Sequence, residues 1–283
     1  MRSLPARIGL SPLPTPRWLL GGLLPGAGAR VEGRRILVTG ASSGVGRVAA
    51  QALAAEGATV LTVARRAEEL AALADEVAAA GGTSYALPCD LTDPGAVDAL
   101  AAEVLDRFGG VDVLVNNAGH SIRRSAADTA ERQHDYERLM RLNYHAPVRL
   151  TLNLLPAMRE QGGGHVVNSS TWGVPGGLMP YFTAYHASKA ALAAFARSLQ
   201  AEERRHGIAV TSLHFPLMRT PMIAPTQEYD ARAALEPEEA AAWVVHAVRH
   251  RPAEVKPTYA SLLQAVNLVS PGLAERLVTA ARP

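Results

Sequence analysis

The chain carries a tyrosine and a lysine at a spacing that suits proton transfer to a carbonyl. Tyr185 and Lys189 lie four residues apart, so on a helix their side chains share one face. A phenol has a pKa of about 10 in water, and a neighbouring ammonium stabilises the phenolate and moves that pKa toward neutrality. A tyrosine in this setting can donate a proton to a carbonyl oxygen. The pair is therefore a candidate for carbonyl chemistry.

Other hydroxyl groups precede this pair. Ser169, Ser170 and Thr171 stand in a row, and alternate side chains of a strand point to opposite faces, so they cannot all face one site. Tyr181 lies four residues before Tyr185, but no lysine follows it at the same spacing. We interpret Tyr181 as an aromatic residue in the wall of a pocket rather than as the proton donor.

A glycine-rich turn near the start of the chain could hold the phosphates of a dinucleotide. The segment TGASSGVG, residues 39–46, stands between an apolar run and a helix-forming stretch. Glycines let the backbone approach a pyrophosphate, and the first N–H groups of the following helix point at the same anion. The expected binding residues of this turn are Gly40, Ser42, Ser43, Gly44, Val45 and Gly46.

The next apolar run ends in Arg65 and Arg66. A protein that binds the non-phosphorylated cofactor usually places an acidic residue there, where it accepts a hydrogen bond from the ribose 2′-hydroxyl. A guanidinium suits a 2′-phosphate instead. We therefore expect NADPH or NADP+ to be preferred over NADH or NAD+.

These residues need a scaffold, and the pattern of the chain predicts an α/β fold. Seven short apolar runs alternate with helix-forming stretches, which is typical of a parallel sheet covered on both faces. We expect a single doubly wound, Rossmann-type domain over 33–283, with its ligand crevice at the carboxyl ends of the strands. The expected strands are 36–39, 59–63, 85–88, 111–115, 165–169, 208–213 and 254–259, and the expected helices are 44–56, 67–80, 94–107, 131–159, 184–205 and 237–250.

The composition excludes several classes of protein. A net charge of +2 is too small to indicate a nucleic-acid partner. The single cysteine, Cys89, rules out an internal disulfide and fits a reducing, cytoplasmic location. His246 and His250 have a spacing that zinc ligands can have, but no third ligand stands near them, so we expect no metal site.

Residues 1–32 differ from the rest of the chain in their prolines, arginines and short apolar patch. The patch, at 18–24, is far shorter than the roughly 20 residues of a membrane span. We expect a flexible N-terminal extension, with a surface-docking segment that contacts a membrane, a cleaved signal peptide and an early start site as alternatives.

Several motifs in order, over about 34–259, make the chain resemble the short-chain dehydrogenase/reductase family: TGASSGVG, the CDL at 89–91, NNAG at 116–119, Asn143 and YHASK at 185–189. The resemblance implies hydride transfer with Tyr185 as acid, Lys189 beside it, and assembly as a dimer or tetramer. It also implies cofactor contacts from Asp90, Leu91, Asn117, Ala118, Gly119, Pro216, Leu217, Met218 and Thr220, besides Tyr185 and Lys189. The family usually has Pro-Gly where this chain has Pro216-Leu217, so the pocket floor should be bulkier.

The resemblance also bears on the catalytic hydroxyl. The family's working serine usually lies three residues after the asparagine of N-x-S-S, which selects Thr171 by counting from Asn168. The serine doublet selects Ser170 instead. Thr171 is fourteen and Ser170 fifteen residues before Tyr185, whereas thirteen is usual, so an insertion exists either way. We favour Thr171 because a one-residue slip turns a strand side chain to the other face.

Asn143 matches the family asparagine whose main-chain carbonyl holds a water that relays protons to the lysine. Pro147 lies four residues downstream and has no N–H, so the helical hydrogen bond to that carbonyl cannot form and the helix should kink. The alternative is a kink that serves packing only.

The second half of the chain resembles the bacterial fatty acyl-CoA reductases and related lipid-acting reductases, through NNAGHSIRRS, DYERLMRLNY, PLMRTPMIAPT and EPEEAA. We expect an apolar or acyl substrate under a lid at about 217–236, and a basic mouth for an anionic carrier formed by Arg123, Arg124 and Arg219. The main alternative is a ketone or secondary-alcohol oxidoreductase that acts on a β-ketoacyl or specialised-metabolite substrate, favoured by the Gly- and Pro-rich loop at 172–180. A non-catalytic nucleotide-binding scaffold is a more remote one.

Overall fold

The structure, a computed structural model, describes residues 9–12, 30–223, 229 and 231–281. The remaining residues of the expected N-terminal extension, and residues 224–228 and 230 of the expected lid, lie outside the described residues.

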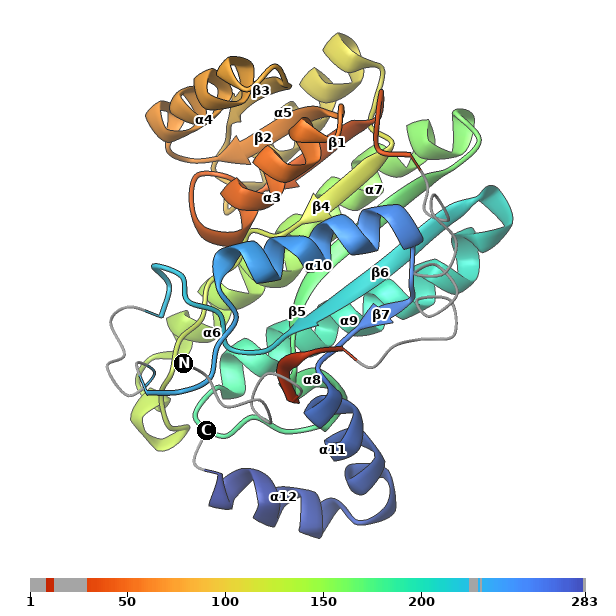
Figure 1. The fold of residues 1–283 in the computed structure, drawn as a ribbon. Helices are drawn as coiled ribbons and strands as arrows, with labels where there is room; N and C mark the ends of the chain where they lie inside the picture. Colours follow the sequence, from red (N-terminus) through yellow and green to blue (C-terminus); the bar gives the residue numbers. More distant parts are fainter. Residues whose placement is uncertain (1–8, 13–29, 224–228, 230, 282–283) are drawn as a thin grey trace.

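A sheet of seven parallel strands forms the centre of the molecule, in the order β3-β2-β1-β4-β5-β6-β7 (Figure 1). The expected Rossmann-type fold is confirmed, because the order reverses beside β1 and all the neighbouring strands pair in parallel. The strands are β1 (Arg35–Thr39), β2 (Thr59–Ala64), β3 (Thr83–Pro88), β4 (Val113–Asn116), β5 (Gly164–Thr171), β6 (Ile208–Phe215) and β7 (Glu254–Val255).

Helices cover both faces of this sheet, and each face has its own core of buried apolar residues. Helices α3 (Gly44–Ala55), α4 (Ala67–Ala79) and α10 (Pro237–His250) pack on one face. Helices α5 (Pro94–Phe108), α7 (Ala146–Glu160) and α9 (Thr183–Glu203) pack on the other. The apolar strand residues are buried on both sides, which explains why the strands read as continuous apolar runs.

The helix expected at 131–159 is divided into three parts, which corrects that prediction. Helix α6 (Gln133–Met140) is followed by a π-helical turn, η2 (Arg141–His145), and then by α7. The N–H of Ala146 donates to the carbonyl of Arg141, which is the longer hydrogen bond of a π-helix. Pro147 follows at once and lacks an N–H, so the α-helical pattern restarts beyond Asn143.

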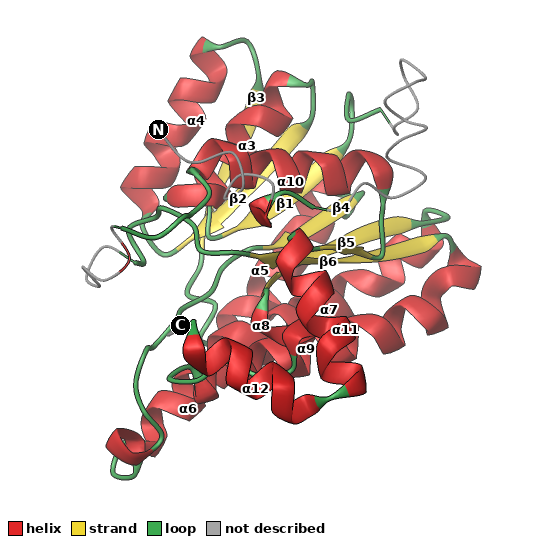
Figure 2. Cartoon of the chain, turned by 60° about the horizontal axis from the view of Figure 1, so that its bottom comes forward, coloured by secondary structure: helices red, strands yellow, loops and turns green. Residues whose placement is uncertain are grey.

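The end of the chain departs further from expectation. Strand β7 is two residues long, because the following segment turns at Pro257 into helix α11 (Thr258–Val269). Helix α12 (Pro271–Ala280) follows, and Figure 2 shows that α11 and α12 project together from one side of the sheet. The expected strand at 254–259 is therefore too long, since Pro257 cannot donate to the ladder.

Candidate active site

The turn between β1 and α3 has the close approach that its glycines predict. Gly40 has φ +70° and Gly44 has φ +55°, in the left-handed region that favours glycine. A Cβ on Gly46 would lie 2.4 Å from the Gly40 carbonyl oxygen and 2.5 Å from Nδ2 of Asn117. These contacts leave no room for a side chain, so the residues fit a cradle whose backbone meets a phosphate directly.

The ends of β1 and β4 are held together beside this cradle. The hydroxyl of Thr39 accepts hydrogen bonds from the backbone N–H groups of Asn117 and Ala118, both at 3.0 Å. Nδ2 of Asn117 donates to the Thr39 carbonyl at 3.0 Å. A Cβ on Gly119 would lie 3.2 Å from Oδ1 of Asn143 and 3.3 Å from Nζ of Lys189. The NNAG segment thus joins the cradle to the lysine.

Two arginines lie at the end of β2, where the sequence predicted them. The Arg66 guanidinium donates to the Ser42 hydroxyl at 3.0 Å and to the Ser42 carbonyl at 3.2 Å, and so braces the β1–α3 turn. Arg65 is exposed. The pKa of Asp90 is lowered, first by hydrogen bonds from Thr92 and also by the charge of Arg65. Arg65 is therefore the cation whose field reaches the expected adenine side of the crevice.

Lys189 and Tyr185 share a face of α9 at the carboxyl end of β5. Nζ of the buried Lys189 donates to the Ser169 carbonyl at 2.8 Å, and burial lowers the pKa of Lys189 to about 8. Burial raises the pKa of Tyr185 to about 12, against a smaller lowering by the Thr171 hydroxyl. The expected shift of the tyrosine pKa toward neutrality is thus wrong for this structure, because desolvation of the phenolate outweighs the neighbouring hydroxyl and the ammonium bonds to the backbone.

The two candidate hydroxyls lie in different surroundings. Thr171 lines the same cavity as Tyr185, and its hydroxyl lowers the pKa of the Tyr185 phenol by hydrogen bonding. Ser170 pairs with His214 of β6, and its buried Oγ has no hydrogen-bond partner within the part of the chain that the structure describes. The structure therefore brings Thr171, rather than Ser170, to the tyrosine.

Asn143 lies buried in the π-helical turn, where its side chain joins three segments. Its Nδ2 donates to the His120 carbonyl at 2.9 Å and to the Ser188 hydroxyl at 3.0 Å. Its Oδ1 accepts from the His120 N–H at 2.9 Å. The amide thus fixes the segment after NNAG against α9, next to Lys189. His120 and Ser188 lie inside the NNAGHSIRRS and YHASK segments, but their contacts with Asn143 were not predicted, because they depend on how the separate segments meet.

An apolar cavity of about 680 Å³ opens onto Thr171 and Tyr185. The loop after β6 contributes the four residues expected beside a nicotinamide, namely Pro216, Leu217, Met218 and Thr220. The rest of the wall comes from three other parts of the chain. The described part of the expected lid contributes Met222, Ile223, Tyr229 and Arg232, and the N-terminal segment contributes Leu10. Helices α11 and α12 contribute Tyr259, Leu262, Leu263, Val266, Leu277 and Val278. The arrangement suits an apolar ligand with one polar end.

Tyr181 does not line this cavity, which corrects its interpretation as a wall residue. Its ring is 48% exposed, and the Arg123 guanidinium lies 5.2 Å from the ring centroid. Its φ of +64° is unusual for a residue other than glycine. Spacing alone indicated neither this conformation nor the exposure of the side chain.

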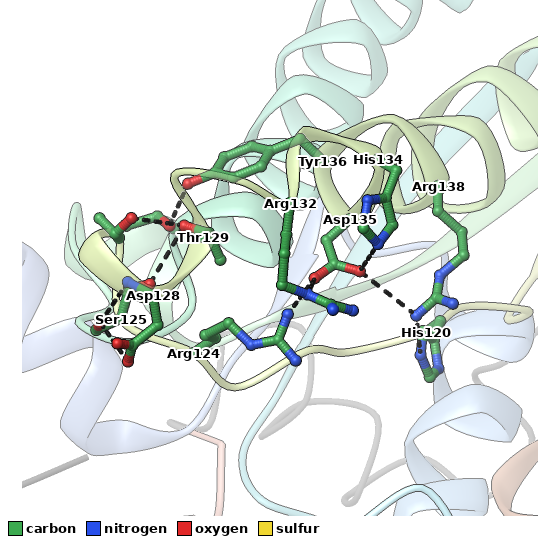
Figure 3. Close-up of polar contacts among 12 residues, drawn as sticks. His120, Arg124, Ser125, Asp128, Thr129, Arg132, His134, Asp135, Tyr136 and Arg138 are labelled. Carbon is green, nitrogen blue, oxygen red and sulfur yellow. Dashed lines mark hydrogen bonds and ion pairs between the residues drawn. The ribbon is translucent and has the colours of Figure 1, made fainter.

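The arginines expected at a basic mouth are engaged in other contacts. Arg124 forms an ion pair with the buried Asp135, which also meets Arg132 at 3.0 Å and Arg138 at 3.9 Å (Figure 3). The surrounding cations lower the pKa of Asp135, with the hydrogen bond from Arg132 as the largest cause. Arg219 lies 3.5 Å from Glu236 and donates to the Arg232 carbonyl at 3.0 Å. Around Asp135, three guanidinium groups, those of Arg124, Arg132 and Arg138, meet a single carboxylate, so this group of four residues has a net positive charge.

Other candidate groups take no part in the site. Cys89 is buried, and desolvation, together with the charges of Asp90 and Asp93, raises the pKa of its thiol to about 11. The rings of His246 and His250 stack at 4.4 Å between centroids. Among the described residues there is no group of three or more side chains that could hold a metal ion, and no helix long and apolar enough to cross a membrane.

A parallel Rossmann-type sheet, a glycine cradle after its first strand and a tyrosine-lysine pair beside its fifth define a nicotinamide-dependent oxidoreductase. The family model for the short chain dehydrogenase matches residues 34–231. The chain belongs to the short-chain dehydrogenase/reductase family.

Three known proteins show what the chain resembles. It is 49% identical to a fatty acyl-CoA reductase of Mycobacterium tuberculosis over 241 residues, 85% of this chain and 82% of that protein. It is 45% identical to a fatty acyl-CoA reductase of Acinetobacter baylyi over 243 residues, 86% of this chain and 82% of that one. The structure of L-sorbose reductase from Gluconobacter frateurii, solved with NADPH and L-sorbose, covers 78% of this chain and 91% of its own at 29% identity and a TM-score of 0.70.

Proposed function

We propose that the protein is an NADPH-dependent reductase that converts a long-chain fatty acyl-CoA to an aldehyde. The observation that carries the proposal is the apolar cavity of about 680 Å³ that Thr171 and Tyr185 help to line, since an acyl chain needs an apolar pocket and its carbonyl needs a proton donor. The two relatives named as fatty acyl-CoA reductases support the same substrate class.

The choice of cofactor rests on the residues at the end of β2. Arg65 is exposed there, while Arg66 is held against Ser42. A guanidinium in this place can pair with a 2′-phosphate, and it offers nothing to accept a hydrogen bond from a 2′-hydroxyl. Asp90, Leu91 and the NNAG segment would hold the adenosine half, and Gly40 to Gly46 the pyrophosphate. The solved L-sorbose reductase, a member of the same fold, carries NADPH.

The residues around the cavity can carry out the proton transfer. When bound, the nicotinamide cofactor supplies a hydride to the carbonyl carbon. Tyr185, whose pKa of about 12 keeps it protonated at neutral pH, donates its proton to the carbonyl oxygen. Thr171 donates a hydrogen bond to that oxygen and so stabilises its developing negative charge. Lys189 and a water on the Asn143 main-chain carbonyl then return a proton to Tyr185.

With a thioester, this step gives a hemithioacetal, which must still collapse. The hydroxyl proton passes to water, the carbon–sulfur bond breaks, and coenzyme A leaves as a thiolate that takes a proton from water. The balance is one thioester, one NADPH and one proton consumed for one aldehyde, one thiol and one NADP+. The mechanism uses no acyl-enzyme. Cys89 is buried and does not line the cavity, so its thiol is not placed to attack the thioester.

A second candidate is a reductase of ketones or a dehydrogenase of secondary alcohols. It is favoured by the ion pairs of Arg124 with Asp135 and of Arg219 with Glu236, because arginines held internally are less available to an anionic carrier. A ketone has no such carrier to bind. Met179, which lines the cavity, packs closely against the backbone of Gly173, where a Cβ would lie 3.0 Å from the Met179 sulfur. This close packing narrows the space beside Thr171 and suits a small ketone.

A screen of NADPH consumption separates the two candidates. The purified protein is incubated with NADPH and, in turn, with acyl-CoAs of increasing length, free aldehydes and ketones. Consumption that is fastest with long acyl-CoAs supports the proposal, whereas consumption with ketones alone contradicts it.

We also propose a cytoplasmic homodimer or homotetramer, and light scattering at working concentration would test the number of subunits.

A further inference from the structure

A short N-terminal segment reaches the substrate cavity, although it lies far from the cavity's other residues in the sequence. Gly9 and Leu10 both line the cavity, and Leu10 is 7% exposed. The segment belongs to the expected N-terminal extension, residues 1–32. A leucine in this position makes the wall of the cavity apolar, so contact between Leu10 and an apolar ligand removes apolar surface from water.

The segment is fastened to the start of α11. The Ser11 carbonyl accepts hydrogen bonds from the N–H of Thr258 at 2.9 Å and from its hydroxyl at 2.8 Å. Pro12 forms an antiparallel bridge with Pro257. Figure 1 shows residues 9–12 in dark red beside the start of α11. Two hydrogen bonds to one carbonyl fix the position of the residue before it, which is Leu10.

The anchor belongs to the same element that forms much of the cavity. The residues that follow Thr258 in α11, among them Tyr259, Leu262 and Leu263, line the cavity with Leu10. Leu10 also belongs to the buried core that α3, α4 and α10 share with the sheet. A side chain held by the core on one side and bordering the cavity on the other is a fixed wall and not a loose cover.

We propose that Leu10 is a specificity-determining residue that limits the length of apolar chain the cavity accepts; in its acyl-CoA form this rests on the proposed function. Because Leu10 is fixed in the wall of the cavity, its side chain takes up volume that an apolar chain could otherwise fill. Its replacement by alanine removes about three carbon atoms and leaves a gap that the packed surroundings fill only in part. A bulkier side chain at the same place shortens the cavity.

The length profile tests this directly. Values of kcat/KM are measured with NADPH and acyl-CoAs of 8 to 20 carbons for the wild type, Leu10→Ala and Leu10→Phe. The Leu10→Ala variant should favour longer chains, with the ratio of long-chain to short-chain kcat/KM raised about tenfold, and Leu10→Phe should lower it. Leu268→Ala is the matched control, because Leu268 of α11 is 86% exposed and should leave the ratio unchanged.

A second measurement needs no turnover and tolerates a change in stability. In a Cys89→Ala background, Leu10→Cys is labelled with a maleimide with and without saturating 1-dodecanol, and Leu268→Cys serves as control. Protection at position 10 alone supports the inference. Protection of position 10 without any acyl-CoA turnover would support the role of Leu10 as a cavity residue but contradict the proposed function. Turnover with an unchanged length profile, or equal labelling with and without alcohol, would overturn the inference.

Discussion

Removing the charge of Lys189 should stabilise the protein while it abolishes turnover. The pKa of this buried lysine falls from its ordinary value of 10.5 to about 8 because of desolvation. Each unit of pKa is worth about 1.4 kcal/mol, so keeping the ammonium in this place costs the folded state roughly 3 kcal/mol at pH 7. Lys189→Met removes that cost and loses the charge-assisted hydrogen bond to the Ser169 carbonyl, worth about 2 kcal/mol. A net gain of about 1 kcal/mol follows.

The sign of the effect depends on pH in a definite way. Between pH 8 and 10.5 the unfolded chain holds the lysine proton and the folded chain does not, so the stability of the wild type rises with pH in that window. The advantage of Lys189→Met is therefore fully present below pH 8 and lost by about pH 10.5.

Urea unfolding of the ligand-free protein, followed by circular dichroism from pH 7 to 10.5, measures the difference. The ligand-free state matters because a cofactor that binds only the folded chain adds its own stabilisation. Lys189→Arg, which keeps the charge, is the matched control and should not stabilise. A Met variant that is less stable than the wild type at pH 7, or a difference that does not change with pH, would refute the reasoning.

Three further predictions concern the site. Tyr185→Phe should lower kcat by at least about 1,000-fold and leave the Kd for NADPH nearly unchanged in calorimetry, since the ring stays and the proton is lost; a dead Tyr181→Phe with an active Tyr185→Phe would reverse the assignment. Thr171→Val should lower kcat by about 100-fold, and Ser170→Ala, measured alongside, by much less; the opposite order would mean that Ser170 is the working hydroxyl. NADPH should bind at least about tenfold more tightly than NADH, a difference of about 1.4 kcal/mol, and Arg65→Ala should shrink that ratio; equal dissociation constants for the two cofactors in the wild type would contradict it.

Much of the fold could be predicted because the sheet is buried on both faces. Strands buried in this way are rich in apolar residues on both faces, as Ile36–Val38 and the pair Val166 and Val167 show. The cradle was equally visible, because only glycine tolerates the φ of Gly40 and the approach of other backbone atoms to Gly46.

The remaining features depend on contacts between distant segments. The burial that raises the pKa of Tyr185, and the Asn143 amide that holds His120, arise only when separate elements meet. Tyr181, an apparent pocket residue, has a left-handed backbone and is 48% exposed, and neither feature follows from its spacing to Tyr185. Leu10 reaches the cavity because the Ser11 carbonyl bonds to Thr258, a pairing across 247 residues of sequence that no local pattern indicates.

The central claim is that the protein reduces a thioester and releases a thiol without a covalent enzyme intermediate. The most direct test incubates the protein with NADPH and palmitoyl-CoA, follows NADPH by absorbance, and titrates free thiol with a chromogenic disulfide. We predict one thiol released for each NADPH oxidised, with the same ratio and rate in Cys89→Ala. Oxidation of NADPH without thiol, or loss of activity in Cys89→Ala, would contradict the account.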